Sequence, residues 1–557
     1  MKDTLTQPRI AVVGFGPRGL GALEALAAEM QGSPTPLQID IFDPFPAPGA
    51  GPNFDPDESP LCRLNIPMRD IDIRPPEIPS VGPFAKWQDG PTDPDAFPPR
   101  AELGRYLEDR HAKLRALDAL SITLLDSEID AVKPDPDGWR LRAKGGWHGP
   151  YAEVLLVPGQ PETAPDDQLA EWQRHVKSGP AALASAYPAR ILQQRAAGWA
   201  GKSVGIRGLA LSAFDVLRVL TTGQGGRFDE GRYLASGREP ARILPFSLDG
   251  QPPSPKPATE ALDARFDPTP AETDTFARAI SRAASGPADL ARAWVNGALL
   301  PPVRRILAET GGDADAVPAW LDTEWTDPGS QDRAAPMEAL RRGIAMAEAT
   351  LPPSVGYVVG QVWRKWQDPL RVGYNPANTP AETARLLTGF DEGLKRYSYG
   401  PPVSSSRELV ALIEAGIVSL DFATDPGIAT APGGWNVTAE DRSAEVDVMI
   451  DAVLPSPDLA AIRAPLIAGL VSEGRMTPCG DKLAAQTAGD GTLIGSDGAR
   501  SRGLCLLGRL ALGSVIAVDS LHDCFGEASR RWARGVTDRI GPPQETEPAA
   551  LPPARSA

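Results

Sequence analysis

The chain has 557 residues, too many for one ordinary domain, and 42% of them are hydrophobic, which is enough to form several buried cores. Its net charge of −16 argues against nucleic acid or a membrane as a partner, because nucleic acid and anionic membranes would both repel it. No segment has the composition of a signal peptide or a membrane span, and the four cysteines are scattered as reduced thiols usually are, so we expect a cytoplasmic protein.

The first elements in chain order form a strand–turn–helix–strand unit. Residues 9–13 are apolar and β-rich, and a glycine-rich turn follows at 14–19. Apolar residues then recur with helical spacing over 20–30, and a second apolar strand is predicted at 37–42. Residues 43–99 are dense in proline, glycine and aspartate, so they form either a loop wrapped around a ligand or an unstructured excursion.

The rest of the chain alternates between predicted strands and helices. Strands are predicted at 121–133, 139–143, 153–157, 202–206, 446–452 and 503–507. Helices are predicted at 100–117, 209–220, 272–284, 290–306, 336–349, 382–394, 406–415 and 520–534.

The turn Gly14-Phe15-Gly16-Pro17-Arg18-Gly19 has the spacing of a dinucleotide site. In such a site the first glycine makes the tight turn, the second lets a pyrophosphate approach the backbone, and the third lets the helix pack on the strand. Asp43 follows 24 residues after Gly19, near the spacing expected for a carboxylate that binds the ribose. We therefore predict that the turn binds a dinucleotide through Gly14, Gly16, Pro17, Arg18 and Gly19, against the alternative of a turn without a ligand.

Two later segments extend the dinucleotide pattern. The strand at 153–157 is followed by Gly159, where the backbone could pass close to the dinucleotide, although an ordinary strand–turn is an alternative. Gly508, Arg509 and Asp519 follow the last predicted strand, where a helix start would direct its amides at an anion or a polar ring edge. An ordinary connection with a helix cap is the alternative there.

A second strand–turn–helix pattern contains Arg207 and Gly208. Ala210 replaces the glycine that would allow close approach, and its methyl group would crowd a pyrophosphate. Arg207 would compensate if it paired with a phosphate. The unit is therefore either a functional nicotinamide site or a vestigial one.

Three other classes of protein lack the residues they need. Cys62 has no second cysteine near it, as a disulfide oxidoreductase would require. The four histidines are scattered, so no metal site is predicted, and His522 is expected to have a structural role. No nucleophile elbow of a hydrolase is present, and no catalytic residue can be identified.

The chain resembles the bacterial FAD-NAD(P)-binding flavoproteins, distant relatives of the flavin-dependent monooxygenases that oxidise amines. The resemblance extends from about residue 8 to about residue 535. It is carried by residues 10–23, 42–44, 48–54, 61–67, 97–100, 207–209, 225–228, 236–240, 395–402 and 507–509.

This resemblance implies a role for each matching position. The three glycines of the first turn would hold the FAD pyrophosphate, and Asp43 would bind the adenosine ribose. Gly49, Gly51 and Asn65 would lie along a loop toward the flavin ring. Arg100 and the segment around Gly508 would complete the pocket.

The sequence departs from the family pattern at two places that concern the nicotinamide cofactor. One is Ala210, and the other is the segment 246–250, where relatives tend to carry two arginines that would suit the 2′-phosphate of NADP. Asp249 in that segment would repel a phosphate but would tolerate free ribose hydroxyls. NADH, or no nicotinamide at all, is therefore more plausible than NADPH.

We expect an α/β protein with a discontinuous Rossmann-type FAD-binding domain at 1–165 and 440–540. A second dinucleotide-binding-like unit is expected at 200–255, a largely helical substrate or cap region at 256–439, and a disordered tail at 541–557.

The expected function is an FAD-dependent oxidoreductase, and specifically a monooxygenase that acts on a small amine-type or amino-acid-type substrate with NADH or NADPH as electron donor. The alternative is an FAD-binding accessory or sensor protein without nicotinamide-driven turnover. The sequence sets neither the substrate nor the oligomeric state.

Overall fold

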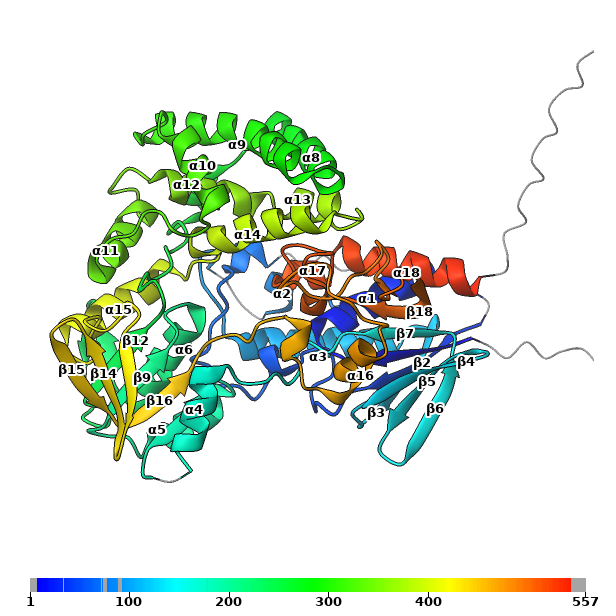
Figure 1. The fold of residues 1–557 in the computed structure, drawn as a ribbon, viewed down its shortest axis with the longest axis horizontal. Helices are drawn as coiled ribbons and strands as arrows, with labels where there is room; N and C mark the ends of the chain where they lie inside the picture. Colours follow the sequence, from blue (N-terminus) through cyan, green and yellow to red (C-terminus); the bar gives the residue numbers. More distant parts are fainter. Residues whose placement is uncertain are drawn as a thin grey trace, which may run out of the picture.

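The structure is a computed structural model that describes residues 8–33, 35–71, 73, 78–88, 93–177 and 179–541. It contains three regions: two built around parallel sheets and one of helices (Figure 1). The predicted α/β fold class is confirmed. The tail predicted to be disordered lies outside the described residues except for Gly541, and the domain boundaries remain predictions.

The first region is built on a six-stranded sheet with the order β17-β18-β7-β1-β2-β3. All neighbouring pairs are parallel except β17 with β18. Its strands are β1 (Arg9–Val13), β2 (Leu37–Phe42), β3 (Leu120–Leu125), β7 (Glu153–Leu156), β17 (Thr492–Ile494) and β18 (Arg500–Leu506). The chain leaves β1 toward β2 and later returns to β7 on the other side, so the end of β1 is a topological switch point, where α/β proteins bind ligands.

Both faces of β1 are buried, which explains why its sequence is an unbroken apolar run. Ile10 and Val12 belong to one core together with α1, α3 and α18, whereas Ala11 and Val13 belong to another. The helices of the first face are α1 (Pro17–Glu29), α2 (Phe84–Trp87), α3 (Arg100–Arg115), α17 (Leu521–Cys524) and α18 (Glu527–Ile540). Covering the second face are β4 (Ala131–Asp135), β5 (Gly138–Ala143), β6 (Gly146–Tyr151) and α16 (Pro465–Ser472).

Two of the elements predicted as continuous are each divided into two in the structure. The strand predicted at 121–133 is two strands, because β3 ends in the six-stranded sheet and β4 starts the antiparallel sheet β4-β5-β6. The helix predicted at 520–534 is interrupted at Gly526, so that α17 and α18 are separate. Apolar pattern alone does not show that a strand has changed sheets.

The second region is built on a four-stranded parallel sheet with the order β12-β9-β16-β8. Its strands are β8 (Ala182–Ser185), β9 (Ser203–Arg207), β12 (Arg242–Phe246) and β16 (Val448–Asp451), and its helices are α4 (Asp167–His175), α5 (Ala189–Ala196) and α6 (Leu211–Leu220). The sequence analysis predicted β9, α6 and β16 but missed β8 and β12, which are only 4 and 5 residues long. The antiparallel strands of this region are β10 (Arg227–Asp229), β11 (Arg232–Leu234), β13 (Gly427–Ala431), β14 (Gly434–Ala439) and β15 (Arg442–Val446).

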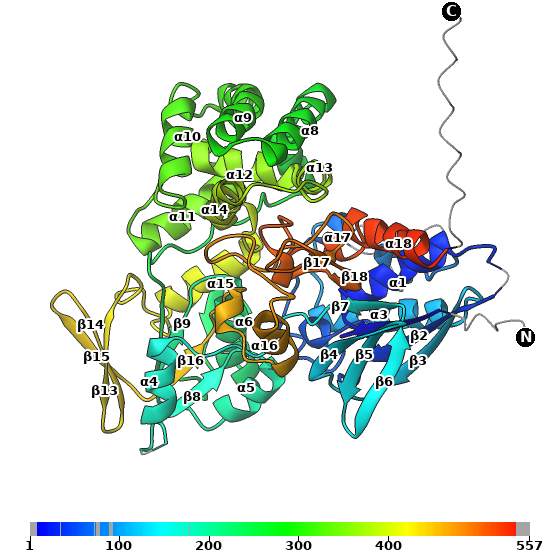
Figure 2. The same ribbon diagram turned by 45° about the vertical axis from the view of Figure 1, so that its right-hand side comes forward.

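The third region consists of helices with one shared core. Its helices are α7 (Glu260–Asp263), α8 (Pro270–Ser285), α9 (Ala288–Thr310), α10 (Val317–Thr326), α11 (Pro336–Ala347), α12 (Val355–Lys365), α13 (Gln367–Tyr374) and α14 (Ala381–Ser398). The following helix, α15 (Val403–Glu414), contributes Leu409, Ala411 and Leu412 to the core of the second region. Ile516 and Ala517, from the C-terminal part of the chain, belong to the core of the third region. The helical region is therefore packed directly on the segment that precedes α17, and both views show α13 above α17 (Figures 1 and 2).

Within the described part of the chain, no helix is both long enough and apolar enough to cross a membrane.

Candidate functional site

The turn after β1 excludes side chains at two of its three glycines through contacts of its own chain. Gly14 has a φ of +86°, and a β-carbon there would lie 2.5 Å from the carbonyl oxygen of Val157, just beyond β7. A β-carbon on Gly19 would lie 2.9 Å from the ring of Phe15. The fold itself therefore requires glycine at both positions.

Gly16 is a different case, because its own chain leaves room for a side chain. Its φ is −83°, and a β-carbon would make only an ordinary contact of 3.6 Å with the α-carbon of Gly51. Gly16 is also the N-cap of α1, and no side chain caps that helix start. A pyrophosphate needs both features, a bare backbone and the amides of a helix start, so the turn fits FAD.

Asp43, at the end of β2, holds the turn from the neighbouring strand. Its carboxylate accepts hydrogen bonds from the backbone N–H of Phe15 at 2.5 Å and of Phe45 at 2.8 Å. Burial raises the pKa of Asp43, while these two backbone hydrogen bonds act in the opposite direction. Each carboxylate oxygen has a second lone pair, so Asp43 can also accept from ribose hydroxyls.

The loop after β2 crosses over the turn. The backbone N–H of Gly49 donates to the carbonyl of Phe15 at 2.8 Å. Gly51 has a φ of +65°, and a β-carbon there would lie 3.0 Å from the α-carbon of Gly16. The structure thus brings Gly51 against Gly16, and the first part of the 43–99 segment is a loop over the turn rather than an excursion away from it.

The C-terminal part of the chain reaches the same turn. Gly508 has a φ of +101°, and a β-carbon there would lie 3.0 Å from the side chain of Arg18. Arg18 forms an ion pair of 2.8 Å with Asp523 and donates to the carbonyl of Val518 at 3.1 Å. The side chain of Arg18 therefore joins the start of α1 to the α17 segment. If Arg18 binds the cofactor as predicted, its backbone N–H would make the contact, because its guanidinium already has protein partners.

Asp519 lies between two cations and directly precedes Ser520, the N-cap of α17, so the helix start predicted there is present. Arg509 contacts it at 2.8 Å and Lys395, at the end of α14, at 2.7 Å. Burial alone would raise the pKa of Asp519, but the two cations lower it to about 2. This network joins the helical region to the C-terminal part of the FAD-binding region.

Two other predicted residues, Gly159 and Arg100, have different surroundings. Gly159 follows β7 with a φ of +64°, and a β-carbon there would meet no atom within 4 Å, so its surroundings are open. Arg100 forms an ion pair of 2.7 Å with Asp215 on α6, and its guanidinium lies over the ring of Tyr187 at 5.3 Å. Arg100 also donates to the backbone carbonyl of Arg63 at 3.1 Å, so it joins the 43–99 loop to the second region. Its role in the FAD pocket remains a prediction.

The second unit holds Arg207 in place with carboxylates. Its guanidinium pairs with Asp166 and, at 3.2 Å, with Asp451. Gly208 has a φ of +121°, and a β-carbon there would lie 3.2 Å from the carbonyl of Ala452. To bind a phosphate, Arg207 would thus have to break its ion pairs with these carboxylates or share its guanidinium with them. The sequence did not indicate these ion pairs.

The sequence analysis did not single out Lys256, a buried residue that contacts the loop carrying Asn65. Its ammonium group donates to the backbone carbonyl of Asn65, on the loop expected to run toward the flavin ring. In the sequence Lys256 stands between two prolines in a polar stretch, which is typical of an exposed loop. His522 has a partner at both ring nitrogens, as a structural histidine does: its Nε2–H donates to the carbonyl of Asp70 at 2.7 Å, and its Nδ1 lies 3.4 Å from the hydroxyl of Ser520.

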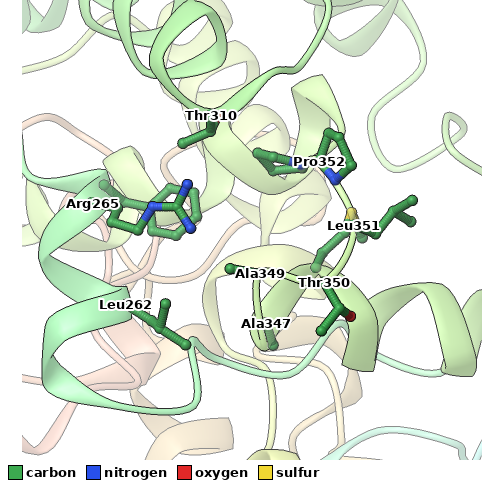
Figure 3. A pocket seen from close by; sticks show the side chains of 11 residues that line it. Leu262, Arg265, Thr310, Ala347, Ala349, Thr350, Leu351 and Pro352 are labelled. Carbon is green, nitrogen blue, oxygen red and sulfur yellow. The ribbon is translucent and has the colours of Figure 1, made fainter.

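A separate cavity of about 110 Å³ lies in the helical region (Figure 3). Arg265, Thr310 and Pro352 are among the residues that line it, and none of the predicted site residues does. Ligand pockets usually measure about 300–1,000 Å³, so this cavity is too small for a dinucleotide. In the part of the chain that the structure describes, no group of three or more histidine, cysteine, aspartate or glutamate side chains could hold a metal ion.

Known proteins are similar to this chain in sequence and in fold. Residues 11–161 match the FAD-NAD(P)-binding family. The nitrosuccinic acid synthase npaA of Aspergillus oryzae is 27% identical, with 85% of this chain and 82% of that protein aligned. An L-aspartate N-monooxygenase (nitrosuccinate-forming) of Streptomyces davaonensis is 26% identical, with 85% of this chain and 86% of that protein aligned. Among solved structures, the ornithine N-hydroxylase of Kutzneria sp. 744 aligns with a TM-score of 0.49 and 15% identity over 96% of this chain and 100% of its own.

Proposed function

Because residues 11–161 belong to the FAD-NAD(P)-binding family, we propose that this FAD-dependent oxidoreductase is an N-monooxygenase of a small dicarboxylic amino acid. The main observation in favour of FAD is at Gly16, where the surrounding chain leaves room for a phosphate and no side chain caps the start of α1. The substrate class is supported by two relatives, one named for nitrosuccinic acid synthesis and one for N-oxidation of L-aspartate. Each of them aligns with 85% of this chain.

The described residues would have the following roles in binding FAD and in joining the regions. The start of α1 binds the pyrophosphate through backbone amides at Gly16, and Asp43 binds the adenosine ribose. Bound FAD would supply the redox chemistry, taking electrons from NADH or NADPH and transferring them to oxygen. Lys395 and Arg509, held by Asp519, connect the helical region to the FAD-binding region.

The relatives favour an enzyme over an accessory or sensor protein, because they are named for catalysis and align with most of this chain. The choice of nicotinamide cofactor remains part of the proposal. The cytoplasmic location is also part of it, supported by the four cysteines Cys62, Cys479, Cys505 and Cys524, which are all free.

The experiment that tests the proposal begins with the absorption spectrum of the purified protein. We expect a flavin spectrum, and in an anaerobic titration we expect NADH or NADPH to bleach it. In air, L-aspartate should give an N-oxidised product in mass spectrometry, whereas L-ornithine should give little.

Two results would contradict different parts of the proposal. A colourless protein that does not take up added FAD would rule out the flavin site. A flavoprotein that is bleached by neither nucleotide would favour the accessory or sensor protein instead.

A further inference from the structure

Lys256 is buried in the segment that connects β12 to α7, and that segment is tightly held. The backbone N–H of Lys256 donates to the carbonyl of Pro401 at 3.0 Å, and the hydroxyl of Tyr357 donates to the carbonyl of Pro255 at 2.9 Å. A β-carbon on Gly400 would overlap the carbonyl of Ser254. The packing of α12 and of the end of α14 therefore fixes the position of the Lys256 side chain.

Lys256 differs from the other buried cations in its partners. Within the residues that the structure describes, four lysines and arginines are buried: Arg110, Arg218, Lys256 and Arg371. The three arginines are each ion-paired with at least one carboxylate. Lys256 forms no ion pair with any described residue, and its hydrogen bond goes to the neutral carbonyl of Asn65.

The charges around Lys256 are already committed to one another. Arg364 pairs with Asp263, and Arg69 approaches Asp70 at 3.8 Å. Burial first, and then the charge of Arg364, lower the pKa of Lys256 to about 7. An ammonium group has three donors, so Lys256 has two beyond its bond to Asn65. A buried cation without an anion is costly, and an anion supplied by a ligand would remove that cost.

We infer that Lys256 binds a carboxylate of the amino-acid substrate, beside the loop that carries Asn65. This inference rests on the proposed function, and it accounts for a substrate with two carboxylates, one of which can be held away from the amino group that reacts. Lys256 is thus a binding residue that orients the substrate, and it takes no part in electron transfer.

The test compares two substitutions in the FAD-loaded protein. Lys256→Met keeps the length of the side chain and removes its charge, whereas Lys256→Arg keeps the charge. Lys113→Met, on the exposed side of α3, is the matched control. Binding of L-aspartate and of succinate, which has both carboxylates but no amine to oxidise, is measured by calorimetry.

We expect Lys256→Met to weaken the binding of both ligands by at least about 30-fold, because one member of a buried charge pair is lost. Lys256→Arg should restore most of the affinity, and Lys113→Met should change nothing. In turnover, Lys256→Met should raise KM for L-aspartate much more than it lowers kcat.

The pH dependence of succinate binding gives a second readout. The charged groups that face Lys256 are Asp70 and Arg69 on the loop, Asp263 on α7 and Arg364 on α12. Carboxylates and guanidinium groups keep their charge between pH 7 and 9. Affinity should therefore fall as pH rises above about 7, where Lys256 loses its proton, and Lys256→Arg should abolish that fall.

The outcomes separate this inference from the proposed function. If Lys256→Met binds L-aspartate and succinate as the wild type does, the inference is overturned while the proposed function stands. A wild-type flavoprotein that binds neither ligand overturns both. If Lys256→Met does not fold, as judged by its flavin spectrum and thermal melting, the pH profiles of the wild type and Lys256→Arg decide, and identical profiles overturn the inference.

Discussion

At the scale of single residues, the three positions of the first turn are occupied by glycine for different physical reasons. Gly14 and Gly19 are required by contacts with Val157 and Phe15, so the fold needs them with or without a cofactor. Gly16 makes no contact that excludes a side chain. A Gly16→Ala variant would therefore fold, and its loss of FAD would report on the ligand rather than on the turn.

Asp43→Asn tests the ribose contact at the end of β2. Asparagine keeps one acceptor but replaces the other with a donor, which would face the backbone N–H of Phe15 or Phe45. We expect the Kd for FAD to rise by about 10-fold, as for the loss of one charge-assisted hydrogen bond. Flavin fluorescence titration of the apoprotein measures this change.

Asp137→Asn, in the exposed β4–β5 turn, is the control for Asp43→Asn and should leave the Kd unchanged. An unchanged Kd in Asp43→Asn as well would show that the ribose has another partner.

Asp391 on α14 predicts a pH-dependent stability. Burial raises its pKa to about 6, Trp363 donates to one of its oxygens at 2.7 Å, and the other oxygen has no partner among the described residues. The folded state therefore binds more protons than the unfolded state between about pH 4 and 6, and stability falls as pH rises through that window. Asp391→Asn should stabilise the protein by roughly 1–3 kcal/mol above pH 6.5 and by less toward pH 4.

Urea unfolding at pH 4.5, 5.5 and 7.5 checks this prediction for Asp391. The exposed Asp274 on α8 provides a matched control, since Asp274→Asn should show no such trend. A gain that is the same at all three values would show that the buried charge is not its cause.

At the scale of elements, the start of α4 holds Arg207, the arginine that the sequence analysis considered for a nicotinamide phosphate. Asp166 caps α4 by accepting from the backbone N–H of Leu169 at 2.9 Å and also pairs with Arg207. The side chain of Asp166 is 51% exposed, so this ion pair is weak enough for a ligand to displace.

Asp166→Asn should lower KM for NADH or NADPH by about 2-fold to 5-fold, which corresponds to a weak exposed ion pair. Asparagine caps helices as well as aspartate does, so α4 should stay intact. Steady-state oxidation of both nucleotides measures the effect.

Asp167→Asn removes the same charge from the next residue, which has no recorded contact with Arg207, and serves as the control for Asp166→Asn. Equal effects in both variants would mean that general charge, rather than release of Arg207, changes KM.

At the scale of the whole molecule, a buried ion pair closes the FAD-binding region between two ends of the chain. Arg18 and Asp523 are 505 residues apart, and their side chains are only 12% and 2% exposed. Both views show α1 and α18 side by side, as do the contacts in their shared core (Figures 1 and 2). The C-terminal segment is therefore a structural part of the turn region.

Arg18→Met should destabilise the apoprotein by about 3 kcal/mol, because the buried carboxylate of Asp523 then keeps only its longer contact of 3.8 Å with Arg371. The double variant Arg18→Met/Asp523→Leu should cost at least about 1 kcal/mol less than the sum of the single changes. A double-mutant cycle by urea unfolding measures the coupling.

The exposed pair Arg292–Asp322 is the control cycle, and its coupling should stay below about 1 kcal/mol. Equal coupling in the two cycles would contradict a structural role for the Arg18–Asp523 pair.

The sequence by itself determined the features that depend on neighbours along the chain. The β1–turn–α1–β2 unit, the spacing of Asp43 and the α/β class follow from local pattern, because apolar periodicity and glycine conformations are local properties. The helical character of most of the segment from 260 to 414 follows from the same kind of pattern.

Only the tertiary structure decided which residues from distant segments meet. The contact of Gly51 with Gly16, the carboxylates around Arg207 and the burial of Lys256 all depend on packing between segments that are distant along the chain. Burial and pairing of charges are properties of the folded surroundings, and a lysine in a polar loop has the same sequence pattern whether it faces solvent or a substrate. The glycine turn was therefore predictable, whereas the substrate contact proposed for Lys256 was not.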